Sequence, residues 1–276
     1  MFGKETYTER RNQLKNAVGH GMILFLGNNE SSINYKDNWY PFRQDSCFLY
    51  FFGIDRAGLS AVIDIDNDTE IIFGDEPSID ELVFFRSAEP VTELATAVGV
   101  KHTRPAADLE KLIRTAREIN CVIHYLPPYR YEDEIRLSFL LGISGHLVQK
   151  GISVSLIKAI VSLRSYKSEE ELVQIEEAIV VTAEMQKAAM RATSIGKMEY
   201  EIVSEVEATA RAFNCNLSFP VILTVEGQVL HNYYHGNRIN GGELLLCDCG
   251  AENGMHYAGD LTRTFPTSGK FSQKQA

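Results

Sequence analysis

The sequence predicts an α/β amino-terminal domain followed by an α+β domain in which two helices lie against a curved antiparallel sheet. The chain has 276 residues, more than the roughly 100–200 residues of a usual single domain. Helix-like and strand-like patterns alternate in its first half, whereas its last third holds two amphipathic helices and then several strand-like segments. We therefore expect two domains, residues 1–155 and residues 156–276.

Composition and charge limit the kinds of partner. The net charge of -10 would repel a phosphate backbone, so we expect no nucleic-acid partner. The start of the chain lacks an apolar core of signal-peptide length, and no later run approaches the roughly 18 apolar residues of a membrane span. The five cysteines form no CxxC pair, which suits a reducing compartment. These features favour a cytoplasmic protein without a membrane partner.

The first half alternates between helices and strands. Its expected elements are a helix around residues 8–18, the strand Met22–Leu26, the strand-like segments AVIDI and EIIF, a helix around residues 106–116 and a strand over residues 121–126. The acidic turn DNDT between the two middle segments resembles a calcium loop, but Thr69 stands where that loop requires glycine, so we expect a hairpin turn.

The breaker Pro127-Pro128 and a helix-like segment over residues 153–165 precede a region of different character, which places the domain boundary within residues 150–166. Four histidines of the first half stand alone in the sequence and are expected to be surface or hydrogen-bonded residues. They are His20, His102, His124 and His146.

Two helices open the second region. Ser168 and Glu171 have the spacing of a capping box, in which each side chain bonds the other residue's backbone amide. The apolar positions expected to face the core of this first helix are Leu172, Ile175, Ala178, Ile179, Val181 and Met185. Those of the second helix are Ile202, Val206, Ala210 and Phe213.

Strand-like segments follow the helices: PVILTVEG, VLHNYY, ELLLCDCGAE and MHYAGDLTRTFP. Asn253-Gly254 marks a turn that folds the last two into a hairpin with Asp248 on one arm and Asp260 on the other. A loop of residues 253–255, centred on Gly254, would place both aspartates directly opposite each other, with Cβ atoms about 4.5–5.5 Å apart. Two such carboxylates would repel each other, so a cation is the economical explanation.

Cys247 and Cys249 flank Asp248 on this strand. Successive side chains of a strand point to opposite faces, so the two cysteines are expected to point away from the face that Asp248 uses.

Several segments resemble the Xaa-Pro aminopeptidase (aminopeptidase P) and prolidase family. The hairpin DCGAENGMHYAGDLTRTFPTSGKF resembles the family's metal-binding hairpin, in which an Asp-x-Gly strand is followed by Asp-x-Thr-Arg-Thr-x-Pro. SFPVILTVEGQVLH resembles the strand pair that ends in Leu-His, and RSYKSEEELVQIEEA resembles the first helix of the catalytic domain. YPFRQDSCFLYFFGI, residues 40–54, resembles the Arg-Gln-Asp-Ser segment of the amino-terminal domain.

This resemblance implies a creatinase-like α/β amino-terminal domain and the first part of a catalytic domain with the pita-bread fold. It implies a metal-dependent aminopeptidase that releases the amino-terminal residue from peptides with proline in second position. The implied cofactors are two divalent metal ions, manganese by preference, with Asp248 chelating one ion and Asp260 bridging both. His231 of the Leu-His match is implied to donate to the substrate or the tetrahedral intermediate. A homo-oligomer, dimer or tetramer, is the implied assembly.

Two departures from the family pattern change what we expect of the hairpin and of the metal site. The family spaces its two aspartates one residue closer, so a larger turn or a bulge is expected around residues 253–255. The family also supplies one His and two Glu ligands after the hairpin, but only sixteen residues follow Asp260 here. We therefore expect this chain to lack three of five ligands and to bind metal weakly.

Three alternatives stay open at this stage. They are an Xaa-Pro dipeptidase (prolidase), a non-catalytic fragment and a binding module of the same fold. His231, His235 and His256 are not expected to replace the absent ligands. Arg263 is expected to be structural and to pair with a nearby carboxylate.

Overall fold

The computed structural model describes residues 1–79, 83 and 89–276. The chain divides into two compact units, Met1–Tyr166 and Lys167–Ala276, and each is described by itself. The boundary lies eleven residues beyond the expected one at 155/156, because helix α8 (Val154–Ser165) buries Leu156, Ala159 and Ile160 in the core of the first unit.

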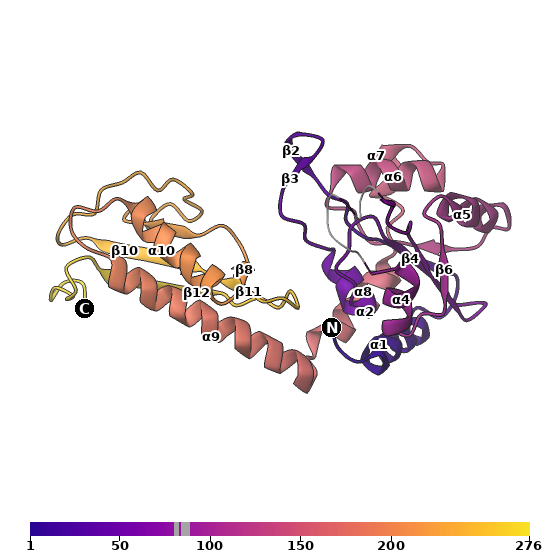
Figure 1. The fold of residues 1–276 in the computed structure, drawn as a ribbon, viewed down its shortest axis with the longest axis horizontal. Helices are drawn as coiled ribbons and strands as arrows, with labels where there is room; N and C mark the ends of the chain where they lie inside the picture. Colours follow the sequence, from indigo (N-terminus) through magenta and orange to yellow (C-terminus); the bar gives the residue numbers. More distant parts are fainter. Residues whose placement is uncertain (80–82, 84–88) are drawn as a thin grey trace. The chain divides into compact units, whose positions relative to one another are not determined.

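A mixed five-stranded sheet forms the centre of the first unit (Figure 1). Its strands, in spatial order, are β6 (His102–Arg104), β5 (Thr69–Phe73), β4 (Ser60–Asp64), β1 (Met22–Leu26) and β7 (Ile123–His124). The pairs β1/β4 and β4/β5 are antiparallel, while β5/β6 and β1/β7 are parallel. The α/β prediction is confirmed, although the strand expected over residues 121–126 is confined to two residues.

Two hydrophobic cores cover the two faces of this sheet. Ile23 and Phe25 of β1 point into one core, and Met22 and Leu24 point into the other, as the alternation of a strand requires. The first core is closed by α1 (Lys4–Val18), α2 (Ser46–Phe52), α4 (Val91–Ala97) and α8. The second is closed by α5 (Asp108–Glu118), α6 (Tyr131–Leu141) and α7 (Gly145–Val148). A small hairpin, β2 (Ser32–Tyr35) with β3 (Asn38–Trp39), extends from the unit (Figure 1).

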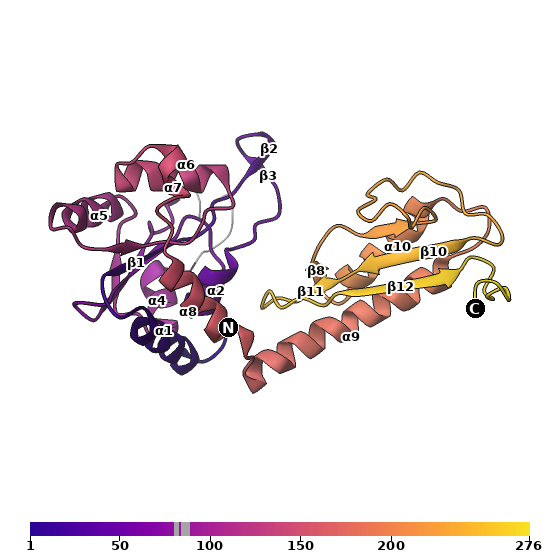
Figure 2. The same cartoon turned by 180° about the vertical axis from the view of Figure 1, so that it is seen from behind.

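In the second unit, two helices lie on one face of an antiparallel sheet (Figure 2). The helices are α9 (Glu169–Ala192) and α10 (Glu199–Ala212). The sheet has the order β12 (Leu261–Pro266), β10 (Leu244–Cys249) and β9 (Ile222–Thr224). A separate pair joins β11 (Ala251–Glu252) to β8 (Asn216–Leu217). This is the predicted arrangement of helices on an antiparallel sheet.

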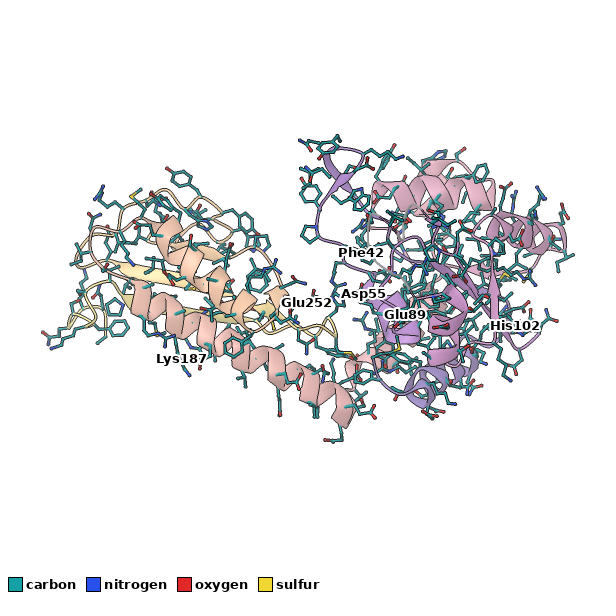
Figure 3. The ribbon with its side chains drawn as sticks, viewed as in Figure 1. Phe42, Asp55, Glu89, His102, Lys187 and Glu252 are labelled. Atoms are coloured by element: carbon teal, nitrogen blue, oxygen red, sulfur yellow. The ribbon has the colours of Figure 1, made fainter. Side chains whose placement is uncertain are left out.

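The capping box at the start of α9 is confirmed. Ser168 Oγ accepts a hydrogen bond from Glu171 N at 3.3 Å, and Glu171 Oε2 accepts one from Ser168 N at 3.1 Å. Lys187, labelled in Figure 3, lies on the outer face of this helix and pairs with Glu184 at 2.7 Å.

The predicted buried faces of the two helices are partly wrong. Ala178, Val181 and Met185 are buried, but Leu172 and Ile179 are 40% and 41% exposed. The buried face of α9 runs instead through the polar residues Thr182 and Gln186, whose side chains find partners in the sheet. Phe213 follows the last turn of α10 and is exposed.

Candidate functional site

The candidate site lies on the face of the second unit's sheet that the helices do not cover. Leu245, Cys247 and Cys249 of β10 are fully buried against the helices, whereas Asp248 between the cysteines is half-buried and points to the opposite face. The prediction that the two cysteines point away from the face of Asp248 is confirmed.

The hairpin that carries Asp248 and Asp260 turns one residue later than predicted. Asp248 pairs with Thr262, so direct opposition of the two aspartates is wrong. Asn253 N donates to Tyr257 O at 3.0 Å, which leaves a three-residue loop centred on Met255 rather than on Gly254. The residue with positive φ, 62°, is His256, not the glycine that the Asn-Gly signal indicated.

Side-chain bonds explain this turn. The Oδ1 atom of Asn253 accepts hydrogen bonds from the backbone amides of Met255 and Tyr257 at 3.0 and 3.1 Å. His256 Nδ1 lies 3.0 Å from Glu252 Oε2, which holds the histidine within the turn. These contacts hold a loop of the predicted length, three residues, one residue later in the sequence.

The two aspartates nevertheless share one face, two positions apart along the hairpin. Asp260 is exposed, yet its pKa is raised, first because its surroundings partly remove water from the carboxylate and then because the Asp248 carboxylate repels its charge and interacts with its protonated form. Asp248 Oδ1 is buried, and it has no hydrogen-bond partner among the described residues. Two adjacent carboxylates with an unsatisfied buried oxygen fit a cation that accepts oxygen ligands.

The number of ligands in the described parts of the chain is small. Among them, no group of three or more His, Cys, Asp and Glu residues could hold a metal ion. The aspartate pair fits two ligands of a metal centre, and carboxylate oxygen is a donor that suits divalent ions such as manganese and magnesium.

His231 lies on an exposed loop that follows β9, not on a strand. The expected strand over VLHNYY is wrong, because residues 225–237 lie outside any strand. The loop is tied back to β9 by a hydrogen bond from Asn232 Nδ2 to Thr224 Oγ1 at 3.2 Å. His235 of the same loop is used structurally, with its Nε2 atom 3.1 Å from Val221 O.

Arg263 is exposed on β12 and donates to the backbone oxygen of Thr262 at 2.7 Å. Within residues 1–79, 83 and 89–276 it forms no ion pair, so the expected carboxylate partner is not found there.

Helix α9 holds the aspartate hairpin through polar side chains that sequence reasoning missed. Tyr257 donates to Glu171 Oε1 at 2.9 Å, and Asn253 Nδ2 donates to the Oε1 and backbone oxygen of Gln174 at 3.0 and 3.2 Å. Thr182 and Gln186 follow on the same helix face. The sequence does hold a signal for these two residues: they are polar side chains, four residues apart, within an otherwise apolar face of the helix.

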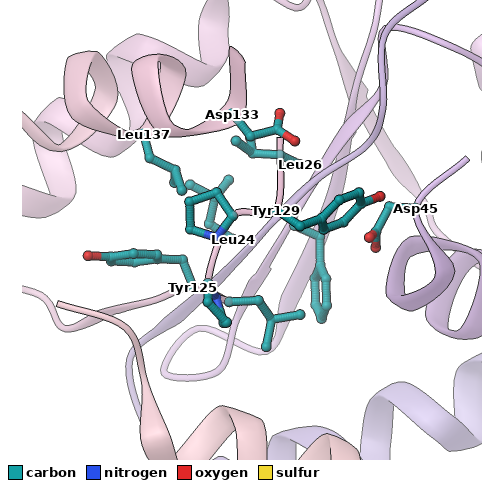
Figure 4. A pocket seen from close by; sticks show the side chains of 11 residues that line it. Leu24, Leu26, Asp45, Tyr125, Tyr129, Asp133 and Leu137 are labelled. Atoms are coloured by element: carbon teal, nitrogen blue, oxygen red, sulfur yellow. The ribbon is translucent and has the colours of Figure 1, made fainter. Parts of the chain in front are cut away.

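A small pocket of about 50 Å³ lies in the first unit beside β1 and the start of α6 (Figure 4). Asp45 in its wall caps α2 by accepting from the amides of Cys47 and Phe48. Asp133 is only 7% exposed, and burial together with the charge of Glu132 raises its pKa to about 6. Asp45 thus has a structural role as the cap of α2.

The histidines of the first unit behave as expected for hydrogen-bonded or surface residues. His124 is buried, with Nδ1 2.7 Å from Ser153 Oγ and Nε2 3.1 Å from His20 O. His102 on β6 is exposed (Figure 3).

The fold agrees with comparisons to known families. Residues 7–123 match the model of the aminopeptidase P N-terminal domain, and residues 173–276 match the model of metallopeptidase family M24. Residues 7–123 thus belong to the aminopeptidase P N-terminal domain family and residues 173–276 to metallopeptidase family M24.

Three similar proteins are named as Xaa-Pro peptidases. The chain is 26% identical to the Xaa-Pro aminopeptidase of Escherichia coli (strain K12), over 99% of this chain and 64% of the relative. It is 27% identical to the Xaa-Pro aminopeptidase of Haemophilus influenzae, over 99% of this chain and 63% of the relative. It is also 26% identical to the human Xaa-Pro dipeptidase, over 94% of this chain and 54% of the relative. The chain thus spans a little under two thirds of the length of the bacterial relatives.

Solved structures show the same fold. The low-pH form of E. coli aminopeptidase P matches with a TM-score of 0.83 at 21% identity, over 99% of this chain and 64% of that chain. A zinc-substituted form of the E. coli enzyme in complex with product matches with a TM-score of 0.82 at 21% identity and the same coverage. The predicted creatinase-like domain followed by part of a pita-bread domain is therefore confirmed as the fold class.

Proposed function

We propose that this chain forms part of a metal-dependent Xaa-Pro aminopeptidase, which releases the amino-terminal residue from peptides with proline in second position. The observation that carries the proposal is the aspartate pair. Asp248 and Asp260 share one uncovered sheet face, the pKa of Asp260 is raised by partial loss of water and by its neighbour, and one buried oxygen of Asp248 has no partner among the described residues. Metallopeptidase relatives with matching names support the substrate class.

Each site residue receives a proposed role. Asp248 would hold one divalent ion and Asp260 would be shared between two, with manganese as the proposed metal. Bound divalent ions polarise a scissile carbonyl and lower the pKa of bound water. His231, exposed on its loop, donates a hydrogen bond to the substrate or to the oxyanion that develops from its carbonyl.

The test is Asp260→Asn in the enzyme that contains this chain. Asparagine keeps the shape but loses the negative charge and one oxygen, so manganese affinity and cleavage of an Xaa-Pro peptide should both fall roughly 100-fold or more. Calorimetric titration with manganese and a peptide assay measure the two effects. Thr264→Val, on the same exposed strand, is the matched control. Retention of more than a few per cent of activity by Asp260→Asn, with manganese present, would contradict the proposal.

A dipeptidase is the second candidate, because the human Xaa-Pro dipeptidase is as similar in sequence as the E. coli aminopeptidase. The two functions differ in the length of substrate accepted. Hydrolysis of an Xaa-Pro dipeptide but not of a longer Xaa-Pro peptide would assign the dipeptidase. Failure to hydrolyse either, with manganese bound, would indicate a non-catalytic member of the fold.

The setting of the enzyme is part of the same proposal. None of the described helices is long and apolar enough to cross a membrane. All five cysteine thiols are free, which supports a reducing, cytoplasmic location. A homo-oligomer, dimer or tetramer, is proposed from the family resemblance, and light scattering of the purified enzyme tests it.

A further inference from the structure

Gln186 occupies an unusual position for an amide side chain. It is 4% exposed and lies in the middle of α9, on the face that packs against the sheet. Its neighbours on that face, Met185 and Ala189, belong to the hydrophobic core. A buried amide in such a place lowers stability unless its polar atoms have partners. Its Oε1 atom has no hydrogen-bond partner among the described residues, so the polar contacts of Gln186 are those of its Nε2 atom.

Those contacts reach both arms of the aspartate hairpin. Gln186 Nε2 donates to Leu261 O at 2.6 Å and to Cys247 O at 3.1 Å, and it lies 3.3 Å from Cys249 Sγ. Since both oxygen partners are carbonyls, the amide nitrogen must face them, which sets the orientation of the side chain. One side chain thus bridges β10 and β12.

The two carbonyls belong to the immediate neighbours of the proposed ligands. Cys247 directly precedes Asp248, and its carbonyl is part of the peptide group that carries the Asp248 amide. Leu261 directly follows Asp260. Gln186 therefore bonds the peptide group that carries the Asp248 amide and, on the other arm, the peptide group between Leu261 and Thr262, one residue beyond Asp260.

The ladder between β10 and β12 ends with the pair Cys249 and Leu261, so Asp248 lies inside the ladder and Asp260 lies just beyond it. β10 ends at Cys249 and β11 begins at Ala251, and a side chain on the intervening Gly250 would collide with the carbonyl of Gly259. Helix α9 takes over part of the bonding here, because Thr182 Oγ1 accepts from Ala251 N at 2.9 Å. Thr182 and Gln186 are four residues apart and lie on the same helix face.

The offset between the aspartates makes this support important. Diagonal positions of an antiparallel pair lie roughly 7–8 Å apart, compared with about 4.5–5.5 Å for opposite positions. The separation of the two carboxylates therefore depends on how the two arms are held where the ladder ends. We propose that Gln186 is a positioning residue that sets the separation of Asp248 and Asp260 by joining the backbones beside them. This inference rests on the proposed function of the two aspartates as metal ligands.

The test is Gln186→Met in the enzyme that contains this chain. Methionine keeps the length and volume of the side chain but removes both N–H donors. Manganese affinity, measured by calorimetry or by the resonance of free manganese, should fall about 10–100-fold, as for residues that orient metal ligands. The kcat of peptide cleavage should fall with it at saturating substrate.

A core variant separates positioning from stability. Val206→Ala removes buried apolar contacts of α10 in the same core and should lower the melting temperature of the metal-free protein without changing manganese affinity. Gln186→Met should reduce manganese affinity well beyond Val206→Ala at an equal or smaller loss of melting temperature. Equal affinities of the two variants and the wild type would overturn the positioning role of Gln186.

A different experimental result would contradict the proposed function of the two aspartates. If the wild type binds manganese but Asp260→Asn binds it equally well, the aspartates are not ligands, and the role of Gln186 is overturned with them. If Asp260→Asn loses manganese and Gln186→Met does not, only the inference about Gln186 is wrong.

Discussion

Two buried charged residues of the first unit differ in the partners that their side chains have. Arg11 is fully buried, yet its guanidinium donates to Glu70 at 2.8 Å and to the carbonyls of Phe51 and Val98 at 2.9 Å. Asp133 is buried to a similar degree, but it forms no hydrogen bond or ion pair within the described part of the chain. The charge of Arg11 is therefore compensated by its partners. The charge of Asp133 is not compensated in this way, and burial disfavours it.

Asp133 should therefore make stability depend on pH. Its folded pKa of about 6 lies above the ordinary value of 3.8, so the folded state binds more protons than the unfolded state between these values. The free energy of unfolding should fall as pH rises through this window, and the loss should persist above pH 6. Asp133→Asn should raise the free energy of unfolding by about 1–3 kcal/mol at pH 8, with the difference shrinking toward pH 4.

Urea denaturation at several pH values measures this effect. Glu118→Gln, which changes an exposed carboxylate of α5 that is not among the charges acting on Asp133, is the control and should show no comparable pH-dependent gain. A gain for Asp133→Asn that is the same at pH 4 and pH 8 would show that charge burial is not the cause.

Helix α9 is the element on which the second unit depends. Its amino-terminal turn is closed by the capping box, and Glu171 of that box also accepts from Tyr257 of the aspartate hairpin. Further along, Gln174, Thr182 and Gln186 contact the same hairpin. The side chains at the start of α9 therefore also contact the hairpin that carries the candidate site.

Ser168→Ala should destabilise the second unit by about 1 kcal/mol, because it removes the acceptor for the Glu171 amide. Thermal unfolding followed by circular dichroism measures the change. Ser204→Ala is the matched control: Ser204 is exposed within α10 and donates only to Tyr200 O, so alanine there should be neutral or slightly stabilising. An equal effect of the two substitutions would mean that the cap does not contribute.

The two units have separate cores, which bears on how the whole chain can be divided. Two hydrophobic clusters lie entirely within Met1–Tyr166 and a third within Lys167–Ala276. Helix α8 completes the first unit, with Leu156 fully buried. The first unit should therefore be an independently folding part only if α8 is intact.

Residues 1–166 expressed alone should form a monomer that unfolds cooperatively. Residues 1–155, which end at the originally expected boundary, lack most of α8 and expose the core beneath Leu156, Ala159 and Ile160. Burial of each such side chain is worth roughly 1–3 kcal/mol, so this shorter fragment should be less stable or associate. Light scattering and thermal unfolding compare the two. Equal behaviour of both fragments would show that α8 is dispensable.

Several features could be predicted from residues that lie close together in the sequence. The alternation around Asp248, the capping box at Ser168 and the strand Met22–Leu26 were all predicted as found. Each of these depends on neighbours a few residues away, through strand parity, a cap spacing or an apolar run. The two aspartates on one hairpin face also followed from the sequence.

Side-chain hydrogen bonds, some local and some long-range, decided the remaining features. The hairpin turns at Met255 because Asn253 bonds two amides of the loop and His256 accepts a positive φ, which outweighed the Asn-Gly signal. The buried face of α9 includes Thr182 and Gln186 because backbone groups at the interrupted strands lie within their reach. A hydrophobic pattern cannot show which polar side chain will find a buried partner, since that partner lies more than sixty residues away in the chain and is brought near only by folding.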